Sequence, residues 1–263
     1  MDPLGRIENS VPKPLKVTAK QIGLNTYFTH LKKSSLYRDF QVRHMEKKKL
    51  RFETAAGEFV LLVPDYSSGV LVTKSGREGG YEPGLVRELA SISDKNDVLY
   101  DIGAGYGYNA KVGESLSIPS KNIHLFEMNW KRVRFCKLNS PESNRTQVRV
   151  GDGSDGTFSV DSYAKIQPSP SIVTMDIEGA ELDALYGLEK TLETARPRLY
   201  IEVHPELLGA AETDLLEYLQ ELGYELSVMN HRSLTASWSA DIRNPSISTE
   251  AYTPTYLLRA VIK

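Results

Sequence analysis

The feature that most constrains the fold is an alternation, from Tyr81 onward, of short apolar runs with longer segments of helical pattern. Such alternation indicates βαβ units, in which parallel strands share one sheet and helices cover its faces. The predicted strands are 97–102, 122–127, 146–150, 171–176 and 198–203, and the predicted helices are 106–117, 129–139, 179–194 and 211–223. With two final strands at 224–229 and 256–262, the sequence predicts a doubly wound, Rossmann-like, mostly parallel sheet of seven strands.

The N-terminal part of the chain differs from the rest in charge. Residues 1–51 contain 12 Lys or Arg and 4 Asp or Glu, whereas residues 52–263 contain 20 and 30, so a basic segment precedes an acidic one. Residues 1–50 are interpreted as an extended arm followed by one or two helices, and the runs 59–63 and 69–73 as a small antiparallel strand pair. We therefore predict a basic α+β cap at 1–80 and a main domain at 81–263.

Composition excludes several classes of protein. The longest purely apolar run is 59–63, far below the roughly 18 residues of a membrane span, and no apolar leader is recognised. A single cysteine, Cys136, excludes an internal disulfide and the zinc patterns that need several cysteines. A folded, cytoplasmic protein is expected.

The glycine-rich loop that follows the first predicted strand is the first candidate for ligand binding. In open α/β sheets, ligands bind beyond the carboxyl ends of the strands. Here the strand ends in DIGAGYG, residues 101–107, directly before a helix. Glycines let the backbone approach a ligand, and amides at a helix start favour an anionic group. The sixth position of a dinucleotide fingerprint is Tyr108, which is too large, and no phosphate-binding P-loop motif occurs. The carboxylate of S-adenosylmethionine suits this loop; an ordinary tight turn is the alternative.

Two acidic residues follow the next strands. Glu127 ends the second strand about 20 residues beyond the glycine loop, where a carboxylate can accept both hydroxyl protons of a ribose. Asp152 follows the third strand and can accept from an adenine amino group. Its position between Gly151 and Gly153 is equally typical of a turn-forming Asp.

Four further residues are predicted to converge on the same rim of the sheet. Asp176 ends the fourth strand, Glu178 begins the following turn, and Glu202 and His204 share one face of the fifth strand. His204 titrates near neutral pH and is a candidate base, although it can equally be a histidine hydrogen-bonded at a strand end. Glu181 is expected to favour the start of its helix. The four residues would alternatively hold Mg²⁺ or Mn²⁺, but we assign no metal site.

The motifs in order resemble those of one family. DVLYDIGAGYGYNA, HLFEMNWKRVRFCKLN, VDSY and IVTMDIEGAELDALYGL followed by RPRLYIEVH are similar to successive motifs of the FkbM family of class I S-adenosylmethionine-dependent methyltransferases. The resemblance covers about residues 81–224, departs at Gly105, where the family often has Asn, and says little about residues 1–75. It implies methyl transfer from S-adenosylmethionine, usually to oxygen, often on sugars or specialised metabolites.

We therefore predict an O-methyltransferase acting on a hydroxyl of a glycan or small metabolite. The alternatives are an RNA methyltransferase that uses the basic arm and a non-catalytic methyltransferase-like binding protein. The predicted catalytic residues are Asp176, Glu178, Glu202 and His204. The residues predicted to bind S-adenosylmethionine are Asp101, Gly103, Ala104, Gly105, Tyr106, Gly107, Glu127, Met128, Asp152, Gly153 and Asp176.

Overall fold

The structure is a computed structural model that describes residues 34–249 and 254–262. The chain divides after Lys48 into two compact units. In the first, helix α4 (Ser35–His44) begins where the Ser34 side chain accepts a hydrogen bond from the Tyr37 amide. Arg43 and His44 lie in the last turn of α4, where basic groups complement the helix dipole. The arm predicted before this helix lies outside the described residues, and the domain boundary at residue 80 stays a prediction.

The second unit is built on a seven-stranded sheet. Its strands are β3 (Leu99–Ile102), β4 (Ile123–Glu127), β5 (Asn144–Gln147), β6 (Ile172–Met175), β7 (Arg198–Val203), β8 (Glu225–Met229) and β9 (Tyr256–Val261). They lie in the order β5-β4-β3-β6-β7-β9-β8, in which β3 to β7 pair in parallel and β9 is antiparallel to both of its neighbours. The chain therefore winds outward from β3 in one direction and then, from β6, in the other. This arrangement confirms the predicted doubly wound sheet.

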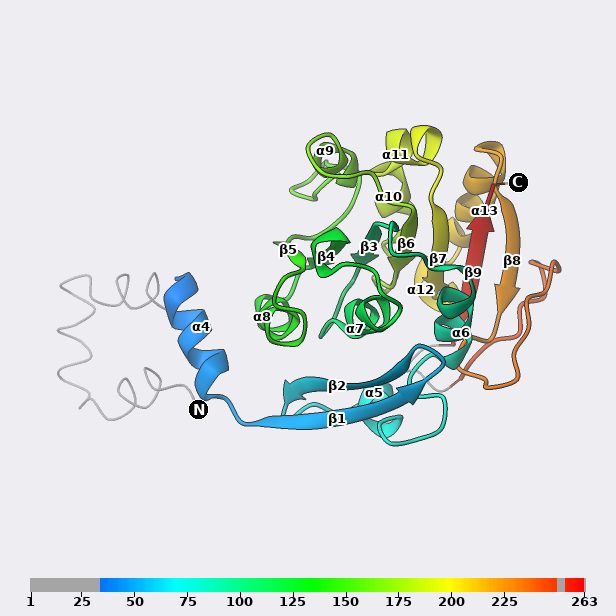
Figure 1. The fold of residues 1–263 in the computed structure, drawn as a ribbon. Helices are drawn as coiled ribbons and strands as arrows, with labels where there is room; N and C mark the ends of the chain where they lie inside the picture. Colours follow the sequence, from blue (N-terminus) through cyan, green and yellow to red (C-terminus); the bar gives the residue numbers. More distant parts are fainter. Residues whose placement is uncertain (1–33, 250–253, 263) are drawn as a thin grey trace, which may run out of the picture. The chain divides into compact units, whose positions relative to one another are not determined.

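Helices cover both faces of this sheet (Figure 1). One face carries α6 (Pro83–Ile92), α7 (Tyr108–Ser115) and α8 (Trp130–Asn139), and the other carries α9 (Val160–Ala164), α10 (Glu181–Tyr186), α11 (Glu189–Thr194) and α13 (Ala211–Glu221). Successive strand residues point to opposite faces, so Leu99 joins the core beneath α6 and α7 whereas Tyr100 joins the core beneath α10 and α13. The shorter elements are η1 (Ser120–Asn122) and α12 (Pro205–Leu208). No helix within the described ranges is long and apolar enough to cross a membrane.

The predicted strand pair is wrong in its partners. Strand β1 (Lys47–Thr54) pairs with β2 (Gly57–Pro64), and the run 69–73 contains instead the short helix α5 (Val70–Thr73). Residues 55–56 alone join the two strands, a length that only a hairpin allows. The basic residues that begin β1 concealed its alternating pattern, in which Leu50 and Phe52 are buried between exposed neighbours.

Two other boundaries differ from prediction. The helix predicted at 179–194 is interrupted at residues 187–188 and forms α10 and α11. A Cβ at Gly187 would overlap the carbonyl oxygen of Gly151, so this turn packs directly against the segment after β5. The third strand ends at Gln147 rather than at residue 150, and Val150 forms a single bridge to Phe158.

Candidate active site

The glycine loop lies at the point where the winding direction changes. Gly103 follows β3 in a left-handed conformation, with φ of 89°. A Cβ there would overlap the carbonyl oxygen of Asp176, so the loops after β3 and β6 touch through their backbones. The loop ends at Gly107, whose φ of 84° also favours glycine and delays the start of α7 to Tyr108. Gly103 therefore brings the loop after β3 against the loop after β6, whereas Gly107 packs against Cys136 of α8.

Glu127, the last residue of β4, is bound to the glycine loop. Its Oε2 accepts from the Gly105 amide at 2.9 Å and its Oε1 from the Asn129 amide at 2.7 Å. The carboxylate is buried, and the Arg132 guanidinium lies 3.9 Å from Oε2. A fixed carboxylate acceptor thus lies next to the loop, and ribose binding by Glu127 stays a prediction.

Other amides of the loop bond within the protein. The Gly103 and Ala104 amides donate to the carbonyl of Phe126 at 2.9 and 3.1 Å, and the Gly107 amide donates to Ala104 at 2.7 Å. Direct hydrogen bonding of these amides to the carboxylate of S-adenosylmethionine therefore stays a prediction.

Asp101 is buried just before the loop. Its Oδ1 accepts from Thr174 Oγ1 at 2.8 Å and from Asn109 Nδ2 at 3.1 Å. Its Oδ2 is buried and has no hydrogen-bond partner among the described residues. Burial raises the pKa of this carboxyl to about 6, although the two hydrogen bonds oppose the shift. Asp101 therefore keeps one acceptor for a donor from outside the chain.

Two side chains predicted to contact the cofactor border this loop. The Tyr106 hydroxyl lies 3.1 Å from Ser67 Oγ, and its ring packs edge-on against Phe135. Met128 follows β4 directly and exposes 66% of its surface, which leaves an apolar side chain available beside Glu127.

Asp152 occupies a turn of its own. Its Oδ1 accepts from the Ser154 amide and hydroxyl at 2.8 and 2.7 Å and from Thr157 Oγ1 at 3.3 Å, and these bonds lower the pKa of the carboxyl. Gly153 donates its amide to the same Thr157 hydroxyl. The side chain is exposed and satisfied locally, which favours the turn interpretation; adenine binding stays a prediction.

Three of the four predicted catalytic residues meet around His204. Its Nε2 lies 3.8 Å from Asp176 Oδ1 and 3.9 Å from Glu202 Oε1, and its Nδ1 lies 3.3 Å from Glu181 Oε1. Glu178, the fourth, is exposed and holds a left-handed φ of 54°. The imidazole is thus enclosed by three carboxylates from the ends of β6 and β7 and the start of α10.

Glu181 is fully buried because its carboxylate is hydrogen-bonded to the backbone at the start of α10. Both of its oxygens accept from the Gly179 amide, at 3.1 and 3.0 Å, so it binds the backbone at the helix start as expected. The same carboxylate also orients His204, a role that the sequence did not indicate.

The neighbouring carboxylates control protonation here. Burial lowers the pKa of His204, but the hydrogen bond to Glu181 and the charges of Asp176 and Glu202 outweigh burial and raise it above the usual value. Burial, reinforced by Glu202, raises the pKa of Asp176 well above that of an ordinary Asp, against the opposing effect of His204.

Sequence reasoning missed a second group of buried residues around Glu202. Arg232 Nη2 donates to Glu202 Oε1 at 2.6 Å, and His231 Nε2 lies 3.4 Å from Glu202 Oε2 and 3.9 Å from Glu82 Oε1. The Arg232 guanidinium also lies 5.2 Å from the centre of the Tyr81 ring. Burial opposes ionisation of Glu202, but His231 and Arg232 hold its pKa far below the usual value. Burial, with added repulsion from Glu202, raises the pKa of Glu82.

The sequence did contain an indication of His231 and Arg232, because both lie just after a predicted strand. Strand β8 is antiparallel to β9, which is antiparallel to β7, so β8 ends on the same rim as the parallel strands. His231 and Arg232 follow its last residue, Met229, and searching strand ends would have found them. Glu82 directly precedes Pro83 at the start of α6, a helix that the sequence did not predict.

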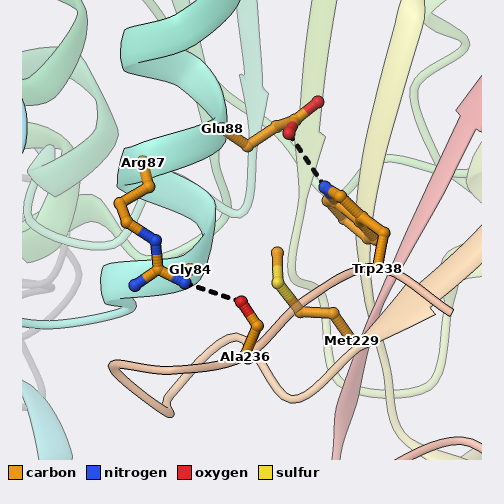
Figure 2. A pocket seen from close by; sticks show the side chains of 6 residues that line it. All are labelled: Gly84, Arg87, Glu88, Met229, Ala236 and Trp238. Atoms are coloured by element: carbon orange, nitrogen blue, oxygen red, sulfur yellow. Dashed lines mark hydrogen bonds between the residues drawn. The ribbon is translucent and has the colours of Figure 1, made fainter.

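Helix α6 holds the loop after β8 in place (Figure 2). The Gly84 amide donates to the His231 carbonyl at 2.8 Å, and the Arg87 guanidinium donates to the Ala236 carbonyl, also at 2.8 Å. Trp238 Nε1 donates to Glu88 at 2.8 Å. A pocket of about 150 Å³ opens between these groups, lined by Gly84, Arg87, Glu88, Met229, Ala236 and Trp238. Because Arg87 is bound to backbone carbonyls of this loop and Glu88 to Trp238, we assign the pocket a supporting role for the loop.

Comparisons with known proteins bear on this arrangement. Residues 155–226 match the methyltransferase FkbM domain. The chain is 22% identical over 182 residues to the hexuronic acid methyltransferase AglP of Haloferax volcanii, which covers 57% of this chain and 73% of the relative.

Solved structures are similar at lower identity. The methyltransferase FkbM from Methylobacillus flagellatus KT is 17% identical with a TM-score of 0.48, over 65% of this chain and 46% of that one. The precorrin-6y C5,15-methyltransferase from Geobacter metallireducens GS-15 is 16% identical with a TM-score of 0.44, over 76% and 95%. This chain therefore spans less than half the length of the first of these structures.

The mostly parallel seven-stranded sheet is that of the class I methyltransferase fold. Within that class, the domain match confirms the predicted resemblance to the FkbM family, and it includes the segment that carries Asp176, Glu181, Glu202 and His204. These findings support methyltransferase function. The RNA alternative rests on a basic segment that lies largely outside the described residues.

Proposed function

We propose that this chain is an S-adenosylmethionine-dependent methyltransferase that methylates a hydroxyl of a glycan or small metabolite. The observation that carries the proposal is the backbone contact between Gly103 and Asp176. This contact joins two halves of the sheet rim. The first half, at the ends of β3 and β4, contains Asp101 and Glu127 and suits the methyl donor. The second half, at the ends of β6, β7 and β8, contains His204 among carboxylates.

The first half fits S-adenosylmethionine. The unpartnered Oδ2 of Asp101 is suited to accept from the ammonium of the methionine moiety. Glu127 accepts from two amides, and a carboxylate offers about four lone-pair sites, so its oxygens can also accept from ribose hydroxyls. The exposed Met128 side chain offers an apolar surface to the adenine ring of the cofactor. When bound, this cofactor supplies a methyl group already activated on a sulfonium.

The second half suits removal of a proton. With Glu181 accepting from Nδ1–H, the His204 tautomer is fixed and the lone pair of Nε2 is directed toward the Asp176 side of the site. When the methyl group of the bound cofactor is transferred to the acceptor oxygen, Nε2 of His204 would take the proton that this hydroxyl loses. His204 is the proposed base and Glu181 a positioning residue.

Arg232 favours an acidic acceptor. Its side chain is buried, Nη2 binds Glu202, and Nε and Nη1 have no hydrogen-bond partner among the described residues. Each of these N–H groups can donate separately to an acidic acceptor. A relative is named for acting on hexuronic acid, so we propose hexuronic acid-containing glycans as the first acceptors to test.

Calorimetry with S-adenosylmethionine tests the donor assignment. Wild-type chain is expected to bind one equivalent, and Asp101→Ala and Glu127→Ala to bind at least about tenfold more weakly. Absence of binding by the wild type, or unchanged binding by both variants, would overturn the assignment.

Transfer of labelled methyl groups tests the acceptor. We expect label on hexuronic acid oligosaccharides in excess of matched neutral oligosaccharides, in a linkage that resists mild alkali because it is an ether. Label that mild alkali releases would instead indicate an ester on the carboxylate and contradict the hydroxyl assignment. Label found only on RNA would contradict the glycan assignment.

A further inference from the structure

We propose that Glu82, Glu202 and His231 form a binding site for one divalent transition-metal ion, of the kind represented by Mn²⁺ or Zn²⁺. This site goes beyond the proposed function, because metal binding can be measured without donor or acceptor. The three residues come from the start of α6, the end of β7 and the loop after β8.

The ligand atoms are already gathered. One oxygen of each glutamate and one nitrogen of His231 all lie within 4.8 Å of one another. His231 Nε2 is 3.4 Å from Glu202 Oε2 and 3.9 Å from Glu82 Oε1. Ligands bound at about 2.0–2.2 Å from a shared ion lie roughly 3 Å apart, so small side-chain shifts would complete the coordination.

The state of His231 is an independent indication of a ligand. Its side chain is 0% exposed, Nδ1 has no hydrogen-bond partner among the described residues, and Nε2 has only the carboxylates of Glu202 and Glu82 nearby, with no well-formed hydrogen bond to either. Buried polar groups are normally hydrogen-bonded, so an orphaned imidazole needs an explanation. Its Nε2 faces both carboxylates, which is the geometry of a metal ligand.

Arg232 is compatible with an ion at this place. It binds Glu202 through Oε1, whereas Oε2 is the oxygen that faces His231. Ligating carboxylates are commonly hydrogen-bonded by residues outside the coordination sphere. The guanidinium therefore orients Glu202 and leaves its second oxygen for the ion.

The backbone around Glu82 is held in an unusual conformation. Glu82 has a φ of 52°, in the left-handed region that side chains rarely adopt. Its neighbours are fixed on both sides, since the Tyr81 carbonyl accepts from the Tyr108 hydroxyl at 2.6 Å and the Gly84 amide donates to the backbone carbonyl of His231 at 2.8 Å. Such conformations persist where surrounding contacts impose them, and they gather at functional sites. Here they aim the Glu82 carboxylate at His231.

The ligand set selects the ion. One imidazole with two carboxylates is a mixed nitrogen and oxygen set, which suits Mn²⁺ or Zn²⁺, whereas Ca²⁺ and Mg²⁺ prefer oxygen alone. Three protein ligands leave coordination positions open. Glu202 lies against both His231 and His204, so the metal site shares a carboxylate with the proposed base.

The experiment uses the full chain, stripped with a chelator and dialysed. Titration with MnCl₂ and with ZnCl₂ is followed by calorimetry, and Mn²⁺ also by loss of the free-ion signal in electron paramagnetic resonance. We expect saturable binding of one ion, at least about tenfold weaker binding of Ca²⁺, and at least about tenfold weaker Mn²⁺ or Zn²⁺ binding in Glu82→Gln and His231→Gln.

Glu178→Gln is the matched control, because it removes an exposed carboxylate from the same rim and should bind metal as the wild type does. Circular dichroism and thermal unfolding without metal show whether each variant is folded. If His231→Gln is unfolded, the near-isosteric Glu82→Gln decides alone. No saturable binding of either ion, or equal binding by wild type and Glu82→Gln, would overturn the metal site. Neither result would alter donor binding, so this proposal and the proposed function can fail separately.

Discussion

The two halves of the rim are built in different ways. Where β3 and β4 end, the Glu127 carboxylate accepts from backbone amides of the adjacent loops. Where β6, β7 and β8 end, Glu202, His204 and Arg232 mainly contact other charged side chains, drawn from segments far apart in the sequence. The first half is held by backbone amides and neutral side chains, and the second depends on mutual compensation of buried charges. Substitutions should therefore affect the two halves differently.

The largest effect is expected from the base. His204→Gln should reduce turnover by about 10²–10⁴-fold and leave affinity for S-adenosylmethionine unchanged, because proton removal is lost and the donor half is intact. Single-turnover transfer and calorimetry measure the two quantities. If affinity for S-adenosylmethionine fell as much as turnover, His204 would also contribute to donor binding, and the two halves would not act independently.

The pH profile sharpens this prediction. The base must be neutral and the pKa of His204 is raised, so turnover should increase as pH rises above the usual histidine value of about 6.5. Glu181→Gln removes part of the stabilisation of the charged form, and the rising limb should move to lower pH. An unmoved limb would contradict the orienting role of Glu181.

The next effect concerns stability. Glu202→Gln leaves the buried Arg232 without its carboxylate and should lower the free energy of unfolding by about 3–5 kcal/mol. Glu127→Gln, the matched change in the other half, should cost about 1–3 kcal/mol, because it disturbs bonds to backbone amides. Urea denaturation compares them. Equal losses would remove the distinction between the halves.

Asp101 is expected to give a smaller, pH-dependent effect. Its pKa is raised from 3.8 to about 6 by burial, so the folded chain binds the proton more tightly than the unfolded chain. This contribution to stability is fully present below about pH 3.8 and is lost as pH rises through 6, by up to about 3 kcal/mol. Asp101→Asn should remove this dependence, so its stability relative to wild type should increase between pH 4 and about 7. Parallel pH curves in denaturation would contradict the raised pKa.

The smallest effect is expected at Asp152. Since its hydrogen bonds are confined to its own turn, Asp152→Ala should weaken donor binding by about threefold or less, compared with at least tenfold for Glu127→Ala. Calorimetry with both variants tests the contrast. A loss at Asp152 as large as that at Glu127 would favour the adenine contact over the turn.

Sequence patterns predicted the sheet because apolar runs such as 97–102 and 198–203 mark buried parallel strands directly. They also located Asp176, Glu202 and His204, since strand ends of a parallel sheet share one edge. They could not reveal that Glu82 reaches His231, because that contact depends on how α6 packs on a loop about 150 residues later. They paired the strand 59–63 with the wrong partner because charged residues conceal the apolar face of β1.

The contact between Gly103 and the Asp176 carbonyl fixes the spacing of the two halves through main-chain atoms alone. No side chain intervenes, so rotamer changes on either loop leave that separation untouched. In related chains that keep this glycine, the surrounding side chains could change, and with them the acceptor that is bound. The distance between the bound donor and the bound acceptor would stay the same.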